Sequence, residues 1–222
     1  MKRSLLVILL VFAAAVVIAG SAKEEKSFKN GLVAHYFQDP EEWNGKWPGE
    51  TSEPLDDPLN WTFTTYKYSR VEPVINHLFI KKGWFTVRWT GWFDPATPGG
   101  DKGNKDKDDG DDDEAGAEYF FEILADDGCR LIINGKTVID DWNARWELEP
   151  EALRKAKGIR LPTGKHDIVV EYFQGQSLKR DDHDPIKVYW SCPERKIPKQ
   201  IVPAAHFSHG KEHLESSDRP KK

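Results

Sequence analysis

The densest group of potential metal ligands in this sequence is the acidic segment 97–117, TPGGDKGNKDKDDGDDDEAGA. Carboxylate oxygens are ligands that Ca²⁺ prefers, so such a run raises the question of a calcium loop. The EF-hand pattern does not fit, because the ligand positions before Gly110 fall out of register. The segment contains no large apolar side chain and therefore has nothing to bury. We predict that residues 97–117 form a disordered acidic loop at the surface.

A second group of carboxylates is the pair Asp126 and Asp127, which precedes Gly128 between two strand-like runs. Asp-Asp-Gly between strands is a common turn sequence, because aspartate accepts hydrogen bonds from nearby backbone N–H groups and glycine tolerates positive φ. A simple turn is therefore one interpretation of this pair. A metal site is the alternative, and both stay open at this point.

Several functional classes lack their sequence signals. The chain has no phosphate-binding glycine loop and no His-Glu-x-x-His zinc motif. Carboxylates are plentiful, but nothing in the sequence places two of them across a cleft, as glycoside hydrolysis requires. The formal net charge of -5 argues against nucleic acid, which selects basic surfaces. We expect a non-catalytic protein that does not bind nucleic acid.

The N-terminus has the three parts of an export signal. Lys2 and Arg3 precede an apolar run over residues 5–19, and the small residues Gly20-Ser21-Ala22 follow it. The run is shorter than the roughly 20 residues that a membrane-spanning helix needs, and no second apolar run of that length follows. We predict a signal peptide over residues 1–22 and a mature protein, without a membrane span, that is secreted, periplasmic or at the cell surface.

The chain has two cysteines, Cys129 and Cys192. An exported protein meets an oxidising environment, in which a disulfide between them is permitted. Two separate buried thiols are the alternative, and the sequence does not decide between the two.

Strand-like runs broken by turn signals fill most of the chain. They are rich in β-branched and aromatic residues, and the aromatic content of 12% is high. Asn134-Gly135 is a strong hairpin signal, because both residues tolerate positive φ. Residues 143–157 form a connector in which we expect one short helix from Glu151. The predicted strands cover residues 85–93, 119–124, 129–133, 137–139, 159–161, 166–173 and 186–190.

Many short strands with almost no helical periodicity predict an all-β fold, a twisted antiparallel β-sandwich or barrel. We expect a single domain over residues 31–207, since all-β folds of this size are common. A charged leader, residues 23–30, precedes the domain. The polar residues 208–222 are predicted to be a disordered tail.

An ordered series of short motifs resembles one known family. The series runs through FTVRWTG from Phe85, LADDGCRL from Leu124, INGKTVIDDW from Ile133, VEYF from Val170 and VYW from Val188. Together they resemble the protective-antigen fragment (PA-fourteen) domain over about residues 30–207. The resemblance implies a jelly-roll-type β-sandwich or barrel and an extracellular setting. Members of the family occur in glycosidases, toxins, flocculins and adhesins and are not catalytic in themselves.

The resemblance also implies a metal site. In sugar-binding members, two adjacent aspartates joined by a cis peptide bond hold a calcium ion, which coordinates sugar hydroxyls. The matching residues here are Asp126 and Asp127. Two neighbouring carboxylates are hard, anionic ligands of the kind that calcium needs, so the resemblance favours calcium as cofactor and a glycan or polysaccharide as partner.

One residue departs from the family pattern. Sugar-binding members place an asparagine soon after the tyrosine of the matching strand, whereas Gln174 follows Tyr172 and Phe173 here. The amide of Gln174 extends one methylene further, and Asp181 or Asp182 in the same loop can replace a missing ligand. Solvated loop charges are the alternative interpretation of these two aspartates. These three residues are the candidate ligand-binding residues.

Three tryptophans have two interpretations each. Trp142 is interpreted as a packing residue first and a sugar-stacking residue second. Trp43 and Trp47, in a loop rich in proline and glycine, are better candidates for exposed aromatic side chains, and half-buried rings that cover the core are the alternative. The leading hypothesis is a calcium-assisted carbohydrate-binding module. The alternative is an extracellular or envelope protein-interaction or scaffold module that uses the fold without calcium.

Overall fold

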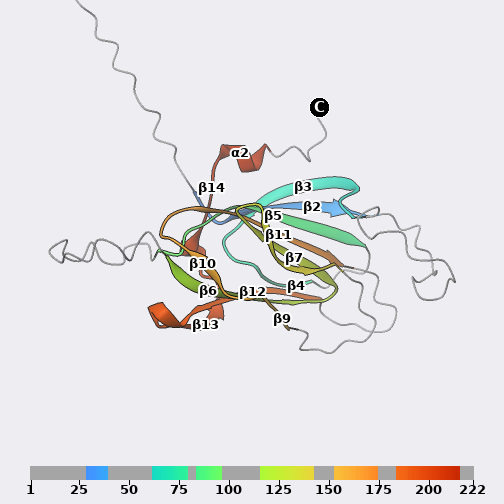
Figure 1. Ribbon diagram of the computed structural model, residues 1–222. Helices are drawn as coiled ribbons and strands as arrows, with labels where there is room; N and C mark the ends of the chain where they lie inside the picture. Colours follow the sequence, from blue (N-terminus) through green and yellow to red (C-terminus); the bar gives the residue numbers. More distant parts are fainter. Residues whose placement is uncertain are drawn as a thin grey trace, which may run out of the picture.

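The protein folds into two antiparallel β-sheets. The computed structural model describes residues 29–39, 62–79, 84–96, 116–142, 153–174 and 184–215. In this part of the chain every strand pairing is antiparallel, and the strands form an 8-stranded and a 6-stranded sheet (Figure 1). The all-β sandwich predicted from the sequence is therefore confirmed.

The larger sheet follows the order β1-β14-β5-β11-β7-β8, and β2 and β3 extend it from β5. Its strands are β1 (Lys29–Asn30), β2 (Leu32–Gln38), β3 (Thr65–Glu72), β5 (Phe85–Phe93), β7 (Gly128–Ile133), β8 (Lys136–Asp141), β11 (His166–Gln174) and β14 (Phe207–His209).

The smaller sheet follows the order β10-β6-β12-β13, with β4 on β12 and β9 on β6. Its strands are β4 (Asn76–Phe79), β6 (Ala117–Ala125), β9 (Leu153–Lys155), β10 (Ile159–Leu161), β12 (Asp184–Cys192) and β13 (Ile197–Ile201). The short helical elements are η3 (Pro193–Arg195), η4 (Ala204–His206) and α2 (Lys211–Leu214).

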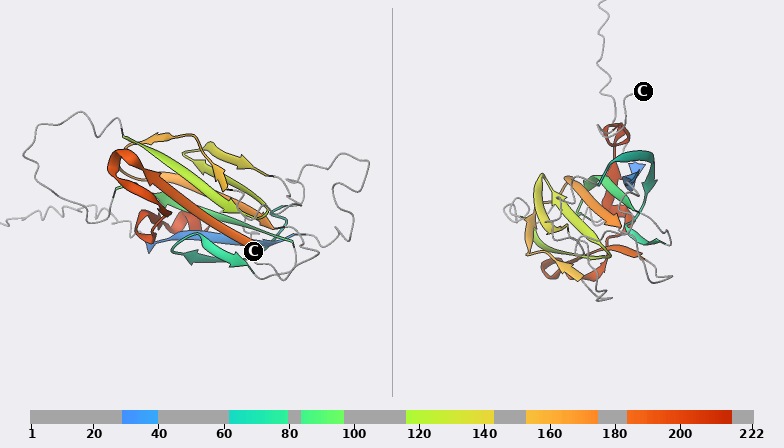
Figure 2. Two further views of the ribbon diagram at one scale, coloured as in Figure 1. Left: turned by 90° about the horizontal axis from the view of Figure 1, so that it is seen from below. Right: turned by 90° about the vertical axis from the view of Figure 1, so that its right-hand side faces the viewer.

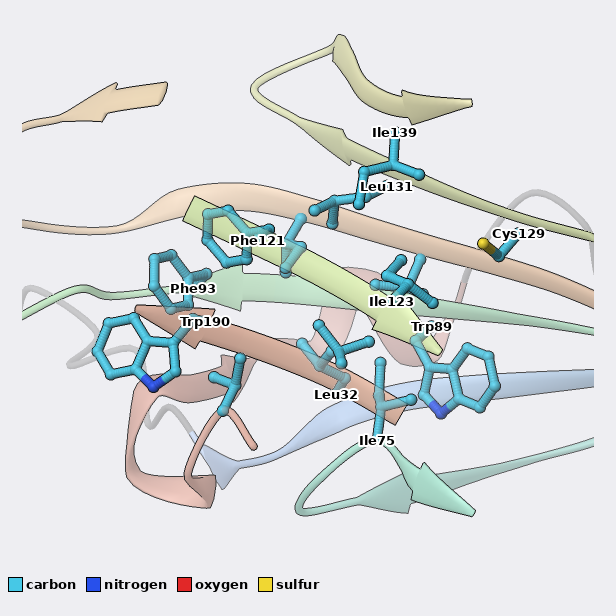
Figure 3. Packing of buried hydrophobic residues seen from close by; sticks show 14 of the residues in the cluster. Leu32, Ile75, Trp89, Phe93, Phe121, Ile123, Cys129, Leu131, Ile139 and Trp190 are labelled. Atoms are coloured by element: carbon cyan, nitrogen blue, oxygen red, sulfur yellow. The ribbon is translucent and has the colours of Figure 1, made fainter. Parts of the chain in front are cut away.

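The core lies between the inward faces of the two sheets. Along β6 buried and partly buried residues alternate at every position, so one face of the strand packs inward. Phe93 of β5 contacts Phe121 and Trp190 of the smaller sheet edge-to-face, and Trp89 of the same strand lies farther along the core (Figure 3). Burying such large aromatic side chains supplies much of the stability of a sandwich of this size.

Each predicted strand overlaps an observed strand. Two of the predictions, 85–93 and 159–161, also begin and end at the observed residues. Asn134 and Gly135 both have positive φ, as the predicted hairpin between β7 and β8 requires.

Four predictions need correction. The expected helix from Glu151 is wrong, because Leu153–Lys155 form strand β9, which pairs with the edge of β6. The tail is not disordered throughout, since Phe207–His209 pair with β1 and β5, and helix α2 follows beyond β14 (Figure 1). The leader contributes Lys29–Asn30 as β1, and Ala117 belongs to β6 and not to the acidic insert. In each case pairing with a distant strand overrides a polar local sequence.

The strands place particular turns at each end of the sandwich. At one end β2 and β11 finish and β5 and β7 begin, because Phe85 lies opposite both Gln38 and Gln174. The Asp126-Asp127 turn is at this end, and we call it the aspartate end. At the opposite end, Phe93 lies opposite His166, and Ala117 lies opposite Leu161. Strand β5 thus ends and β6 begins at the end of the sandwich far from Asp126, and the left view of Figure 2 shows the strands running lengthwise between the two ends.

Candidate functional site

The Asp126-Asp127 turn carries the chain from β6 in the smaller sheet to β7 in the larger one. The peptide bond between the two aspartates is cis, which is the arrangement that the family resemblance implies. Asp127 is buried, with 7% of its surface exposed, and Asp126 is partly buried.

Gly128 completes this turn for a reason that the sequence did not reveal. A Cβ atom at this position would lie 2.0 Å from Cε1 of the Phe173 ring on the neighbouring strand. Glycine is thus needed for the close approach of β11 and not for a positive φ, and the simple turn interpretation is wrong on this point.

The last residues of β11 lie against the turn. The hydroxyl of Tyr172 donates to the backbone carbonyl of Asp126, and it also lies 2.6 Å from Oε1 of Gln174. Tyr172 and Gln174 project from the same face of β11, because they are two residues apart. The hydroxyl therefore connects the amide of Gln174, which is only 3% exposed, to the aspartate turn.

A buried guanidinium supports the turn from the other side. Arg154 of β9 donates through Nη1 to the carbonyl oxygen of Ala125 and through Nη2 to that of Asp127, at 2.9 Å. Its Nε lies 2.6 Å from Oδ2 of Asp141 at the end of β8. Arg154 is 8% exposed, so this ion pair is shielded from water. It fixes the backbone on both sides of Asp126.

Trp142 packs beside the site. It is 7% exposed, its ring stacks on Phe63 at 5.8 Å and meets Phe173 edge-on at 4.9 Å, and the Arg130 guanidinium lies 4.4 Å from its centroid. A ring covered in this way is a packing residue, as the first interpretation of Trp142 held.

Asp39 is a further carboxylate at the aspartate end. It is 5% exposed, and its Oδ1 accepts from the backbone N–H of Thr64 at 3.3 Å and the hydroxyl of Thr86 at 3.4 Å. Burial raises the pKa of Asp39 from 3.8 to about 6, and these hydrogen bonds oppose the rise only in part.

The structure brings together three of the predicted site residues, Asp126, Asp127 and Gln174. Asp181 and Asp182 lie outside the described residues, as do Trp43, Trp47, the signal peptide and residues 97–115. Within the described ranges, no helix is long and apolar enough to cross a membrane.

The disulfide is not formed. Cys129 in β7 and Cys192 in β12 are both buried, and no disulfide joins these two described residues. The alternative of two separate thiols is therefore the one observed.

The residues at the turn have the types of donor atom that calcium binds. They offer two carboxylates and an amide oxygen, the hard oxygen donors that calcium prefers. Calcium takes six to eight such ligands, and the described residues contain no group of three or more His, Cys, Asp or Glu side chains that could hold a metal ion. Further ligands would have to come from elsewhere in the chain, from water or from a bound sugar.

Comparison with known proteins identifies the fold. Residues 114–202 match the family described as PA14 domain, and this stretch includes both aspartates, Tyr172 and Gln174. Residues 114–202 of this chain are thus similar to the PA14 domain family. The family resemblance stated from the sequence motifs is thereby confirmed.

Proteins similar to this chain have more than one biological role. The anti-sigma-I factor RsgI3 of Acetivibrio thermocellus is 26% identical over 157 residues, 67% of this chain and 20% of that protein. An anti-sigma factor domain-containing protein from Clostridium clariflavum has a similar fold, with a TM-score of 0.55 and 22% identity over 83% of this chain and 48% of that one.

A yeast adhesin has a similar fold. The Epithelial Adhesin 9 A domain from Candida glabrata, in complex with Galb1-4GlcNAc, has a TM-score of 0.53 at 14% identity over 86% of this chain and 94% of that one. This chain thus spans nearly the whole adhesin domain, but only a fifth of the curated relative and about half of the anti-sigma structure.

Sequence reasoning missed two residues that complete the turn, Arg154 and Asp141. Arg154 lies in the segment that was expected to be helical, and Asp141 ends a hairpin strand. No local pattern links them, because the ion pair forms only when β9 and β8 meet at the edges of two different sheets.

Proposed function

We propose that this chain is a non-catalytic carbohydrate-binding module, exported to the cell surface or beyond, that binds sugar with the help of calcium at the aspartate end. The observation that carries the proposal is the convergence of Asp126, Asp127 and Gln174 on one turn, joined by the hydroxyl of Tyr172. The adhesin A domain, whose structure contains a bound disaccharide, supports it through a shared fold.

In this proposal the chain's own residues prepare the site. Asp126 and Asp127 would hold calcium and Gln174 would add its amide oxygen, while Tyr172 and Arg154 keep the backbone of the turn in place. When bound, the ion supplies a positive centre for which vicinal sugar hydroxyls are ligands. Asp181 and Asp182 remain candidate ligands in the loop that follows Gln174.

Calorimetric titration with calcium tests the proposal on the double variant Asp126→Asn and Asp127→Asn. The variant keeps the shape of both side chains but removes their negative charge, so calcium affinity should fall at least about tenfold. Calcium should raise the melting temperature of the wild type, because a ligand that binds only the folded state stabilises it. Calcium should not raise that of the double variant.

A matched control removes a carboxylate elsewhere. Asp140→Asn, on β8, changes an exposed side chain that pairs with Arg130, and it should leave calcium binding unchanged. The titration is repeated after deletion of residues 97–115, whose aspartates could bind calcium loosely. A glycan array with calcium and again with chelator then identifies the sugar. A wild type with no saturable calcium site after this deletion would exclude the calcium mechanism.

A second candidate is a protein-interaction or scaffold module that uses the fold without calcium. The Arg154 guanidinium favours it, since a buried cation already occupies the carbonyl oxygens of Ala125 and Asp127. The 26% identity to an anti-sigma-I factor also points to a regulatory protein as the larger context. Ligand binding that is unchanged by chelator would support this candidate.

A further inference from the structure

The most exposed large hydrophobic side chains of the described residues all lie on two strands. They are Tyr68 and Val71 on β3 and Leu78 on β4, with exposed fractions of 43%, 42% and 53%. Within the described chain, β3 pairs only with β2, and β4 pairs only with β12. These strands follow one another in sequence and are the edges of different sheets, so they border one open side of the sandwich, which we call the β3–β4 edge.

Register shows which side chains of β3 face inward at this edge. Tyr68 lies opposite Tyr36, and Glu72 lies opposite Leu32, and both partners belong to the core. Arg70 shares this face, because it is two residues from each. Val71 lies on the other face of the same strand. Tyr68 and Arg70 thus point toward the interior side of the sandwich but stay 43% and 53% exposed.

A buried carboxylate organises this edge. Glu72 is 4% exposed, and its Oε1 accepts from the hydroxyl of Tyr36 and from Nε of Arg70, both at 2.6 Å. Its Oε2 accepts from Nε1 of Trp89 at 2.6 Å and lies 2.8 Å from Nε2 of His77. The Glu72 carboxylate thereby connects β3 to β5 and, through His77, to β4.

The same network fixes the two exposed side chains. Tyr36 accepts from Nη2 of Arg70 at 2.9 Å, and its ring stacks on Tyr68 with centroids 4.7 Å apart and an interplanar angle of 19°. Tyr68 therefore has one ring face supported by protein, and its exposed surface is held in a defined orientation. Arg70 uses two of its five N–H donors on Glu72 and Tyr36, which leaves donors for a ligand.

A rigid exposed ring beside a fixed guanidinium has a specific use in recognition. The ring provides a flat apolar face for the C–H groups of a pyranose, and the guanidinium pairs with a carboxylate. Arg70 is the exposed charged side chain on this face and is basic, so the site favours an anionic ligand. Because the side chains are already ordered, binding loses little conformational entropy.

We propose that Tyr68 and Arg70 form a second saccharide site, separate from the aspartate end and independent of calcium, which selects a pyranose that carries a carboxylate. Tyr68 stacks on the sugar ring and Arg70 binds the acidic group, while Glu72 and Tyr36 position both. The charges also argue against pairing of β3 with a second copy, since antiparallel strands would bring Lys67 near Arg70 of the partner copy.

The test compares two matched probes, methyl β-D-glucuronide and methyl β-D-glucoside, by NMR titration of the full chain with chelator present. The wild type should bind the glucuronide about tenfold more tightly, the factor expected from one charge-assisted hydrogen bond. Tyr68→Ala should weaken binding of both probes. Arg70→Gln should lower the affinity for the glucuronide to that for the glucoside. Val71 is equally exposed on the opposite face of the strand, so Val71→Ala should leave the affinity for both probes unchanged.

Several outcomes would overturn the proposal. Equal affinity for the two probes would exclude the proposed role of Arg70. Absence of glucuronide binding would exclude the proposed site as a whole. An equal loss in Val71→Ala and Tyr68→Ala would indicate another binding mode, such as pairing of an extended peptide with the edge. Loss of glucuronide binding in the Asp126→Asn, Asp127→Asn variant would assign it to the aspartate end. With chelator present, that variant should bind as the wild type does, so failure here is separate from failure of the calcium site.

Discussion

Glu72 and Asp39 are two carboxylates that are buried to nearly the same extent, 4% and 5% exposed, yet they behave in opposite ways. Burial alone would raise both pKa values. At Glu72 hydrogen bonds from His77, Tyr36 and Trp89 outweigh burial and lower the pKa from 4.5 to about 2. At Asp39 burial dominates, and the pKa rises from 3.8 to about 6.

The difference lies in the partners. Glu72 sits where two sheet edges meet, so donors from four strands, including a guanidinium, converge on it at 2.6–2.8 Å. Asp39 sits at the end of β2, where Thr64 and Thr86 provide neutral donors at 3.2–3.4 Å. Burial therefore stabilises or destabilises a charge according to the donors that surround it.

The largest effect is expected for Glu72→Gln, which removes the charge but keeps the size of the side chain. The pKa of Glu72 is lowered on folding, so its charge stabilises the native state above the unfolded pKa. The free energy of unfolding at pH 7 should fall by about 3 kcal/mol. Denaturant unfolding measures this, with Asp140→Asn as an exposed control that should cost less than about 1 kcal/mol.

The pH profile is the sharper part of that test. The stability that Glu72 contributes should be lost as the pH falls from about 4.5 to about 2, so wild type and Glu72→Gln should converge over this window. A difference that persists unchanged at pH 2 would mean that packing, and not the charge, is responsible.

A smaller effect of opposite sign is expected for Asp39→Asn. The pKa of Asp39 is raised on folding, so the folded state holds the proton more tightly and loses stability as the pH rises from about 4 to about 6. Replacing the acid with a neutral amide should raise the free energy of unfolding at pH 7 by about 1 to 3 kcal/mol. Thermal melts at pH 4 and pH 7 should show a gain only at the higher pH, and a loss at pH 7 would contradict the comparison.

The smallest effect is expected for removal of the carboxylates of the acidic insert, which the sequence predicts to be exposed to water. Deleting residues 97–115 and joining Ala96 to Gly116 by a short turn removes most of the acidic insert without touching a described strand. Because loop closure depends only weakly on length, stability should change by less than about 1 kcal/mol. A larger loss of unfolding free energy, measured by denaturant unfolding, would show that the insert packs or binds an ion. Its carboxylates would then stabilise the native state, as Glu72 does.

The sequence alone determined the fold class and about half of the described strands of this protein. Alternation along Phe85–Phe93 and the turn residues Asn134-Gly135 are local signals, because they depend on side-chain period and on backbone φ. The Asp126-Asp127 pair could also be picked out, since its motif is contiguous in the chain.

Only the tertiary structure decided which partners surround the charged groups. Arg154 meets the aspartate turn from a segment whose sequence resembles a helix, and it becomes a strand because β6 offers an edge to pair with. Glu72 is buried because β3 and β4, which are edge strands of different sheets, lie side by side. No local sequence pattern indicates this arrangement. Periodicity reports which face of a strand is apolar, but the pKa and role of a charge depend on atoms that are distant in sequence.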